Sequence, residues 1–556
     1  MSPSFAEAVG TSILASAFLV LASAEPAVRA RPLPQAAAYD VRTFGAKGDG
    51  RAVDSGAINN AIAAASAGGG GTVEIPAGRY LSFSIRLKSH VTLQFNPGAV
   101  LIAGDPASGL GQYDLPEKNA SDQYQDFGHS HWQNSLISGI DVEDVGIIGP
   151  GLIDGRGLTR AGPGAPWVKR PGGDRPLSMG AAVGGPGDPE TALRRMDGLG
   201  NKAIALKRAR NVTLRDFSIL NGGHFAVLAT GVDNLTIENL KVDTNRDGFD
   251  IDTCRNVRIS NVTVNSPSDD AIVLKSSWAL GEARPTENVT ITNCLVSGYD
   301  VGSVLDGTFR RTQERAPDRD GVTGRIKLGT ESNGGFRNIT ISNCVFDRSR
   351  GLAIETVDGG VVEDITVTNL TMRDVTTAPL FLRIGNRGRG PDGTPVGRMR
   401  RIHISHVVAD NVDPQFAASI AGIPGSPVED VTLSDIRLVY RGGGTSADAV
   451  RDVPEVEDAY PEPSMFGTLP AYGLFVRHAR GVTLRDVTIS TIGADARPAV
   501  FLQDVEGAAL DHVQASSTPP GPFAILRDIR DLSLRNVARV GDAHIDRLAQ
   551  GTIPYR

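Results

Sequence analysis

The chain has 556 residues, with 56 Lys and Arg against 63 Asp and Glu, and a formal net charge of −7. This mild acidity, with a pI near 5.8, argues against a nucleic-acid-binding protein, which normally carries a basic face. A mean hydropathy of −0.11 with 21% charged residues excludes both a disordered chain and a multi-span membrane protein.

The first residues are typical of a secretory signal peptide. An apolar run that begins at Val9 ends in Ala-Ser-Ala at residues 22–24, and small residues at such positions mark a cleavage site. We therefore expect a signal peptide at residues 1–24 and a linker at residues 25–38. The protein is then exported, periplasmic or secreted, with no further membrane segment.

A nine-residue phrase, roughly N-[VIL]-T-[IL]-x-[ND]-[VLC]-x-[VI], recurs through the chain. It alternates apolar and polar residues, which indicates a strand with one buried face, bounded by a turn residue. Such a strand cannot bury its apolar face alone, whereas coils stacked about 4.8 Å apart can. Copies begin at Asn211, Asn234, Asn256, Asn288, Asn338, Asp364, Arg401, Asp430 and Gly481, with weaker copies at Gly507 and Asp531.

The period of this phrase predicts the fold class. The closer copies are 22 to 26 residues apart, which corresponds to one coil per copy. We therefore expect an all-β fold, a right-handed single-stranded parallel β-helix that occupies residues 39–556 as one domain. A leucine-rich repeat or a propeller is the alternative for such a period, but leucine spacing and blade signatures are both missing.

The start of the solenoid and its insertions differ from the repeats. Residues 39–50 (YDVRTFGAKGDG) predict a strand and a glycine-rich turn, and residues 54–67 predict an N-terminal amphipathic helix that caps the apolar core. We expect the long insertions to be loops that wall a groove on one face. These insertions lie at residues 159–200, 306–324, 385–399 and 440–473.

The three cysteines, Cys254, Cys294 and Cys344, are odd in number and widely spaced, which argues against a disulfide framework. Each follows or lies within a repeated strand, so we interpret them as small buried core residues. One disulfide, between Cys294 and Cys344, stays open if their coils stack.

Acidic residues are densest in NRDGFDID and SPSDDAIVLKS. Asp247 and Asp269 are 22 residues apart, which is one coil, so stacking brings Asp247 close to Asp269 and Asp270 on one outer face. Crowded carboxylates repel one another, which raises at least one pKa and permits an acid and a base at one pH. Glycoside hydrolysis needs such a pair. Turn aspartates are the alternative interpretation, but three acids in register favour catalysis.

Several segments together resemble glycoside hydrolase family 28, the polygalacturonase-like enzymes. They are YDVRTFGAKGDG with the helix after it, IIGPGLIDGRG, NRDGFDID and SDDAIVLKS. The resemblance implies a cofactor-free catalytic domain that cleaves uronic-acid-containing glycans of pectin with inversion. It implies that Asp269 is the general acid and that Asp247 and Asp270 hold and deprotonate the water. Asp250 matches a supporting acidic position.

Two positions depart from the pattern of the family. The family has a Gly-His-Gly whose histidine supports the acid, and that histidine position corresponds here to Gly324. The Arg-Ile-Lys that grips a substrate carboxylate corresponds to Ala353-Ile354-Glu355. Ordinary polygalacturonan in the usual pose is therefore doubtful, and a rhamnogalacturonan-like substrate is favoured.

Other side chains are candidates for the tasks of the missing residues, although a solvated arginine or a turn histidine is the simpler interpretation of each. Arg325 and Lys327 could bind a carboxylate or a sugar hydroxyl, and Glu355 could replace a lost contact. His224, one coil before Asp247, could support acid–base chemistry. The remaining substrate-binding candidates are Lys275, Arg383, the donors His129 and His131, and Trp132 as a stacking platform for a sugar ring.

No metal or cofactor is expected, because HExxH and CxxC motifs are missing, and no G-x-S-x-G elbow supports a Ser-His-Asp triad. We interpret the chain as a monomeric hydrolase of an acidic plant-type polysaccharide or oligosaccharide, with loops that favour attack at chain ends. A β-helix polysaccharide lyase is one alternative, with Lys275 or Lys327 as the base and a calcium ion on the aspartates. A non-catalytic glycan-binding solenoid is the other, although binding alone would not need three crowded acids.

Overall fold

The computed structural model describes residues 38–124, 127–159, 194–317, 320–516 and 521–556. The expected signal peptide, nearly all of the expected linker and most of the insertion after Thr159 lie outside these residues. Within the described ranges, no helix has both the length and the apolar character needed to span a membrane.

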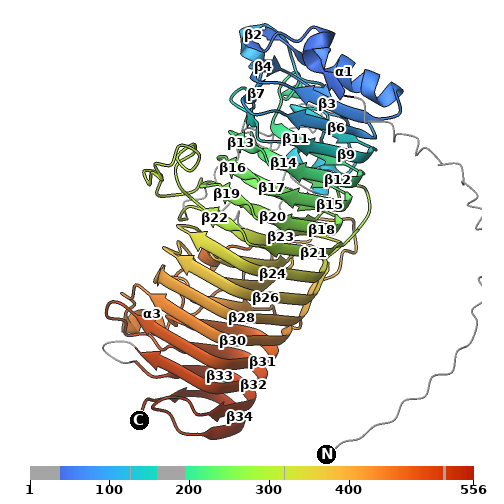
Figure 1. Ribbon diagram of the computed structural model, residues 1–556. Helices are drawn as coiled ribbons and strands as arrows, with labels where there is room; N and C mark the ends of the chain where they lie inside the picture. The colour runs from blue at the N-terminus through green and yellow to red at the C-terminus, as the bar shows by residue number, and fades with distance from the viewer. Residues whose placement is uncertain (1–37, 125–126, 160–193, 318–319, 517–520) are drawn as a thin grey trace, which may run out of the picture. The chain divides into compact units, whose positions relative to one another are not determined.

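The strands stack coil upon coil into three parallel ladders, which confirms the right-handed parallel β-helix (Figure 1). The first is called the site ladder. It consists of β5 (Ile85–Arg86), β8 (Ile137–Ile140), β11 (Lys202–Lys207), β14 (Phe225–Thr230), β17 (Asp247–Asp252), β20 (Ile272–Ser276), β23 (Ile326–Ser332), β25 (Leu352–Thr356), β27 (Leu380–Ile384) and β29 (Ala418–Ala421).

The second is called the repeat ladder, because it contains the first half of each repeated phrase. It consists of β1 (Ala38–Asp40), β3 (Gly71–Ile75), β6 (Val91–Phe95), β9 (Glu143–Ile148), β12 (Arg210–Arg215), β15 (Asp233–Glu238), β18 (Arg255–Ser260), β21 (Thr286–Thr292), β24 (Phe336–Asp347), β26 (Val361–Arg373), β28 (Arg398–Val412) and β30 (Val428–Tyr440).

The third ladder follows the second half of the phrase. It consists of β2 (Asp49–Val53), β4 (Gly78–Ser82), β7 (Ala99–Ala103), β10 (Leu152–Asp154), β13 (Ser218–Leu220), β16 (Lys241–Asp243), β19 (Thr263–Asn265) and β22 (Leu295–Ser297), which pairs with the end of β24. The last coils are long continuous strands, β31 (Leu474–Thr491), β32 (Val500–Ser516) and β33 (Ala524–Arg535).

Each repeated phrase is bent rather than straight, which corrects the expectation of one strand per phrase. In the copy from Asn211, both Asn211 and Asp216, its first and sixth residues, have left-handed backbone with φ of 57° and 71°. Asparagine and aspartate tolerate this conformation better than other non-glycine residues. The first-position asparagines also bond along the stack, since Asn234 Nδ2 donates to Asn211 Oδ1 at 2.9 Å. The polar positions of the phrase therefore turn the backbone at two corners.

The apolar positions of the phrase form one continuous core inside the coils. In the same copy, Val212 and Leu214 are buried on one arm, and Phe217 and Ile219 are buried on the next. Their counterparts in the other copies pack into the same cluster. Removing apolar surface from water contributes about 25 cal/mol per Å² to the free energy of unfolding, so this core is the main source of stability.

Both ends of the core are closed. Helix α1 (Ser55–Ala67) packs Ile58 and Ile62 against the first coils, which confirms the predicted capping helix (Figure 1). At the other end, β34 (Ala543–Ile553) pairs antiparallel with β33. The shorter helices are α3 (Ser446–Ala449) and the 3₁₀ turns η1 (Val41–Phe44), η2 (Pro106–Ser108), η3 (Asp122–Tyr124), η4 (Phe127–Ser130) and η6 (Pro463–Phe466).

The cysteines are buried in this core, as the sequence predicts. The coils of Cys294 and Cys344 do stack, because the next residues, Leu295 and Val345, are partners in the ladder. All three thiols are free.

Charges alternate strictly along one outer column of the repeat ladder. Facing partners form ion pairs, such as Arg255 to Glu287 at 2.9 Å and Arg400 to Glu363 at 2.8 Å. A shift of one coil by one residue would turn the side chains of that coil to the opposite face and break the match of its charge with the neighbouring coils. In order along the solenoid, the column contains Glu143, Arg210, Asp233, Arg255, Glu287, Arg337, Glu363, Arg400, Glu429, Arg480, Glu506 and Arg530.

We predict that Arg337→Glu lowers the free energy of unfolding by about 1 kcal/mol, because it places three acids in a row with Glu287 and Glu363. Thermal unfolding at low and high salt measures this effect, which should shrink as salt screens the repulsion. The control is Arg437→Glu, an exposed arginine whose ladder partners, Val408 and Thr488, are uncharged. Equal losses in the two variants would contradict a role of the column.

Candidate active site

The two acidic motifs lie on neighbouring strands of the site ladder. β17 pairs in parallel with β20, with Phe249 opposite Ile272, and this register places Asp247 beside Asp270. One carboxylate oxygen from each of Asp247, Asp269 and Asp270 lies within 4.8 Å of the others. The structure therefore brings the three predicted acids together.

The three acids differ in environment. Burial, followed by the charge of Asp269, raises the pKa of Asp247 well above its usual value. Burial alone would also raise the pKa of Asp270, but Lys327 and Arg325 outweigh it and lower this pKa to about 2. The surroundings therefore favour the protonated form of Asp247 and the ionised form of Asp270.

Asp269 is the most accessible of the three acids. Its side chain is 24% exposed, whereas Asp247 and Asp270 are buried. Arg246 Nη2 donates to Asp269 Oδ2 at 2.6 Å from the preceding coil. Arg246 lies inside the NRDGFDID motif, 23 residues before Asp269, so the one-coil spacing that places Asp247 beside Asp270 is the signal that could have indicated this contact.

The position of the family histidine, Gly324, has no room for a side chain. Its backbone is left-handed with φ of +53°, and an added Cβ would lie 2.0 Å from the backbone oxygen of Ser297. The next residue approaches the aspartate instead, because Arg325 Nε donates to Asp270 Oδ1 at 2.8 Å. A guanidinium thus contacts Asp270 from the residue that follows the position where the resemblance predicts a histidine.

Arg325, Lys327 and Glu355 form a buried ionic network with the insertion at residues 440–473. Lys327 Nζ lies 3.7 Å from Asp270 Oδ2 and 3.4 Å from Glu355 Oε2. Arg325 Nη1 donates to Glu462 Oε2 at 3.1 Å. The side chains of Arg325 and Lys327 are each 1% exposed, so they act on their neighbours rather than on a sugar.

Glu355 is also fully buried. Burial raises its pKa to about 7, although Lys327 and Arg325 favour the ionised form. Its carboxylate therefore completes the network beside Asp270 and is not presented to solvent.

A second buried network lies on the other side of the aspartates. His129 Nε2 lies 3.0 Å from Asp250 Oδ2, and Lys275 Nζ lies 3.6 Å from the same oxygen. Lys275 Nζ also donates to Glu331 Oε2 at 2.9 Å. Burial alone would lower the pKa of Lys275, but Glu331 and Asp250 raise it well above its usual value. The structure thus brings His129, Asp250 and Lys275 together as charge-balancing neighbours of the cluster.

His224 lies next to the cluster, as its predicted register requires. The residue after it, Phe225, is the ladder partner of Asp247. The rings of His224 and Phe225 meet edge to face with centroids 4.5 Å apart. His224 is only 8% exposed, so it reaches the site edge rather than bulk solvent.

Trp132 and His131 do not serve the expected roles. The Trp132 ring is fully buried, with Nε1 donating to Thr230 Oγ1 at 2.9 Å and Lys207 Nζ 3.7 Å from the ring centroid. It is therefore not a platform for a sugar. His131 is also fully buried, with Nε2 3.1 Å from Asp122 Oδ1. An aromatic and histidine-rich stretch does not by itself reveal which side chains face inward.

Arg383 is likewise not a surface residue of the site. Its Nη1 donates to the backbone oxygen of Gly422 and its Nη2 to that of Glu455, each at 2.9 Å. Burial, followed by the charge of Arg477, lowers the pKa of Arg383 to about 9. The insertion covers this arginine, so the expected contact with substrate is wrong.

Two residues of the insertion complete the site and were not predicted. Tyr460 accepts from Lys327 Nζ at 3.4 Å, and Glu462 contacts both Arg325 and Lys327. They lie far from the acidic motifs in the sequence and outside the repeats. No periodic signal therefore links them to the aspartates.

The same three aspartates are spaced closely enough to hold a cation. Three positive side chains face them, however, because Arg325, Lys327 and Lys275 each act on the pKa of Asp270. Such a positive surrounding opposes a divalent cation at this position.

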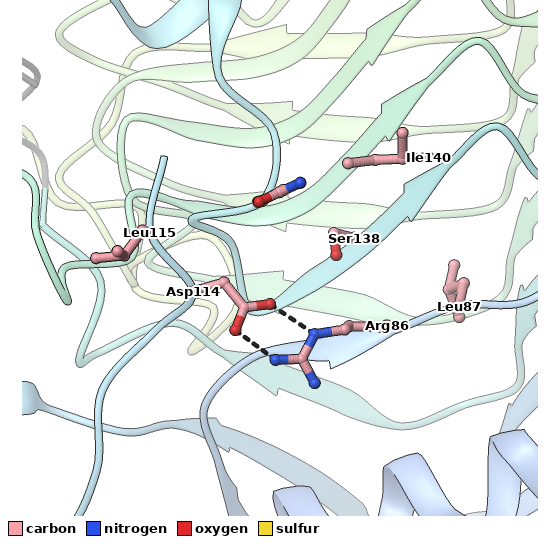
Figure 2. Close-up of a pocket in the computed structure, with 7 residues that line it drawn as sticks. Arg86, Leu87, Asp114, Leu115, Ser138 and Ile140 are labelled. Carbon is pink, nitrogen blue, oxygen red and sulfur yellow. Dashed lines mark hydrogen bonds and ion pairs between the residues drawn. The ribbon is translucent and has the colours of Figure 1, made fainter. Parts of the chain in front are cut away.

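An open pocket of about 440 Å³ lies elsewhere on the site ladder, around β5 and β8 (Figure 2). Arg86 and Asp114 form a two-point ion pair across it, with Nε to Oδ2 at 2.7 Å (Figure 2). The lining contains none of the predicted site residues.

We predict that Asp247→Asn stabilises the fold at neutral pH. A carboxyl whose folded pKa is raised binds its proton more tightly in the folded than in the unfolded chain, so its contribution to stability falls as pH rises above about 3.8. Thermal unfolding should show a gain for the variant that vanishes at acid pH. The exposed Asp392→Asn is the control. A constant difference at every pH would contradict the raised pKa.

Comparisons with known proteins show which families the chain is similar to. A family model described as "Rhamnogalacturonase A/epimerase, pectate lyase-like" matches residues 38–137, and one described as "Right handed beta helix region" matches residues 195–312. A probable polygalacturonase from Vitis vinifera is 26% identical over 423 residues, which cover 71% of this chain and 73% of that protein.

Two further relatives extend the comparison. An exo-poly-alpha-D-galacturonosidase from Dickeya chrysanthemi is 23% identical, with 72% of this chain and 71% of that protein covered. The crystal structure of an exopolygalacturonase from Thermotoga maritima has the same fold, with a TM-score of 0.55, 18% identity, and 93% and 95% of the two chains covered. The chain is therefore similar in sequence to polygalacturonases and shares the fold of an exopolygalacturonase, which confirms its predicted resemblance to the polygalacturonase-like enzymes.

Proposed function

We propose that the protein is an exported glycosidase that hydrolyses O-glycosidic bonds of a pectin-type polysaccharide. The observation that carries the proposal is the cluster of Asp247, Asp269 and Asp270, in which a raised pKa favours the protonated form of Asp247 and a lowered pKa favours the ionised form of Asp270. Glycoside hydrolysis requires both states at one pH. The names of the polygalacturonase relatives support the same chemistry.

In the proposed reaction, Asp269 protonates the leaving oxygen while Asp247 and Asp270 hold and deprotonate the water. The exposure of Asp269 suits contact with the glycosidic oxygen. Arg325 and Lys327 keep Asp270 ionised, so Asp270 is the member of the pair that accepts the proton of the water. The raised pKa of Asp247 means that the cluster binds a proton readily, and in the proposed reaction this proton passes to Asp269, which gives it to the leaving oxygen, so that Asp247 is ionised when it holds the water.

We propose inversion at the anomeric carbon because family 28 enzymes work in this way. The separation of the carboxylates is not the support, since their nearest oxygens lie within 4.8 Å of one another, closer than the roughly 6.5–9.5 Å between the carboxyl groups of most inverting sites. In the proposed inversion, the water held by Asp247 and Asp270 attacks the anomeric carbon directly. A retained product would instead identify a carboxylate nucleophile.

We propose a rhamnogalacturonan-like backbone as the substrate in preference to homogalacturonan. Ala353 and Glu355 replace the cations that grip a uronate, and Glu355 is buried against Lys327. Neither position presents a positive charge to a substrate carboxylate. The match to a family model described as "Rhamnogalacturonase A/epimerase" supports this choice, whereas the relatives' names favour polygalacturonan.

We propose attack at chain ends. Residues 453–466 cover the outer face of the site ladder beyond β23, where Phe466 packs against Phe381 and Phe475. The middle of a polymer could bind across Asp269 only if this face were open in both directions along the solenoid. Residues 453–466 cover it in one direction, so a chain end fits better. The exo name of the Dickeya relative agrees with the proposal.

In this geometry, neither lysine that was considered as the base of a lyase is suited to that role. Elimination needs a neutral lysine or arginine near the C5 proton. Lys275 is paired with Glu331, and Lys327 with Glu355, and the pKa of each lysine lies above its usual value because these acids outweigh burial. Both amines therefore stay protonated.

We predict that Asp269→Asn abolishes cleavage, with a loss of about 100-fold or more, because the leaving oxygen is no longer protonated. The measurement is a digest of homogalacturonan, rhamnogalacturonan and their oligomers, with products separated by chromatography and absorbance followed at 235 nm. We expect new reducing ends without absorbance, released as short products from the start. The exposed Asp392→Asn is the control.

Absorbing products would establish the lyase, and activity that survives Asp269→Asn would remove the acid role. Mid-chain products at the start of the digest would contradict attack at chain ends. Cleavage of homogalacturonan alone would contradict the choice of substrate.

We predict that the first product formed has the anomeric configuration opposite to that of the cleaved bond, because water attacks directly. Proton NMR of the anomeric signals during the first minutes of a digest, before mutarotation, measures the configuration. Retention at that stage would reject the inverting mechanism while leaving the glycosidase assignment in place.

A further inference from the structure

The insertion that contains Glu462 is held in place by contacts with the rest of the fold. Arg477 donates to the backbone oxygens of Val453 at 2.8 Å and Pro454 at 2.9 Å. Phe466, at the end of the segment, packs into an apolar cluster with Phe475 on the outer face of the site ladder. These contacts fix the backbone on both sides of Glu462.

Glu462 is buried among cations. Its carboxylate accepts from Arg325 Nη1 at 3.1 Å and from Arg325 Nη2, and lies 3.1 Å from Arg350 Nη1. Lys327 Nζ lies 3.9 Å away. The pairing of both terminal nitrogens of Arg325 with one carboxylate is the two-point geometry that orients a guanidinium most firmly.

The same guanidinium reaches Asp270 with its remaining nitrogen. Arg325 Nε donates to Asp270 Oδ1 at 2.8 Å. Because a guanidinium is planar and rigid, fixing its two terminal nitrogens also fixes the direction of Nε. Glu462 and Asp270 are therefore joined through one rigid group, although they belong to segments almost 200 residues apart.

We propose that Glu462 is a positioning residue that acts through Arg325 and holds its Nε against Asp270. The inference rests on the proposed function, in which Asp270 accepts the proton of the attacking water. Through this contact the insertion supplies part of the machinery of the active site, where Gly324 leaves no room for a histidine.

Glu462 can act on Asp270 through its negative charge alone or by positioning Arg325. These two roles predict opposite changes in the pKa of Asp270 when Glu462 is removed. Loss of a nearby negative charge, with Arg325 unmoved, would lower the pKa of Asp270 further. Loss of the anchor leaves two buried guanidinium nitrogens unpaired, and a buried unpaired cation reorients towards another acid. Glu355 is such an acid nearby, since it acts on the pKa of Arg325. Asp270 then loses its hydrogen bond, and its pKa rises.

The groups around Asp270 determine the direction of this change. The positive groups are Lys275, Arg325 and Lys327, and the acidic groups are Asp247, Asp269, Glu355 and Glu462, with the Tyr460 phenol beside them. Removing Glu462 takes one negative charge out of these surroundings, and this change of charge alone lowers the pKa of Asp270, so a rise in that pKa can come only from the loss of the Arg325 contact.

The test compares Glu462→Ala and Glu462→Gln with the wild type. We expect Glu462→Ala to lower kcat about 10- to 100-fold with KM nearly unchanged, because the proton acceptor is misplaced and the sugar contacts remain. The acid limb of the pH profile should move towards the ordinary carboxyl value near 4. Glu462→Gln keeps one acceptor for Arg325 and should recover part of the loss. The control is Glu457→Ala, a half-buried acid of the same segment.

A direct titration keeps the inference independent of the substrate. In protein labelled with ¹³C at the aspartate carboxyl carbon, the Asp270 signal is identified by its loss in Asp270→Asn. Between about pH 3 and 6 we expect the wild-type signal to stay ionised and the Glu462→Ala signal to titrate. If Glu462→Ala does not fold, the same titration of Asp270 in Glu462→Gln tests the positioning role.

The outcomes separate the two proposals. An unchanged or lowered pKa of Asp270 in the variants, or a fall in kcat equal to that of Glu457→Ala, would overturn the positioning role. A wild type that cleaves no pectic glycan would reject the proposed function, while the titration would still test the contact between Glu462, Arg325 and Asp270.

Discussion

The parallel hydrogen bonding between successive coils is the constraint on which the rest of this structure depends. It forces residues about one coil apart to lie in line, so any chemical pattern with that period becomes a column on the molecule. The same register produces the asparagine corner, the alternating charge column and the meeting of Asp247 with Asp270. The core inside the coils stabilises all three, because each coil buries its apolar face only against its neighbours.

Burial and nearby charges give the three neighbouring acids different environments. Asp247 lies where desolvation and a second carboxylate favour its proton, whereas Asp270 lies against Arg325 and Lys327, which favour its charge. Asp269 is left at the surface with Arg246. Two identical side chains, Asp247 and Asp270, thereby differ in their affinity for a proton, and the surrounding ion pairs balance charges that would otherwise be costly to bury.

The insertion at residues 440–473 shows how a departure from the repeat becomes part of a site. It packs on the outer face of the coils that follow the aspartates and reaches back to them through Glu462 and Tyr460. The arginine that approaches Asp270 needs a partner for its other nitrogens, because a guanidinium with unsatisfied donors is unfavourable in a buried place. The insertion supplies that partner.

The sequence by itself determined the coil, the capping helix and the meeting of the three aspartates, because each of these follows from periodicity and from spacing by one coil. It did not reveal that the phrase bends at its sixth residue, nor that Trp132, His131 and Arg383 are buried. Those outcomes depend on which segment covers a residue from outside, and covering segments such as residues 453–466 have no period. The tertiary structure alone therefore decided the ionic partners of Asp270, since Arg325 and Glu462 meet only where an aperiodic insertion folds onto a periodic ladder.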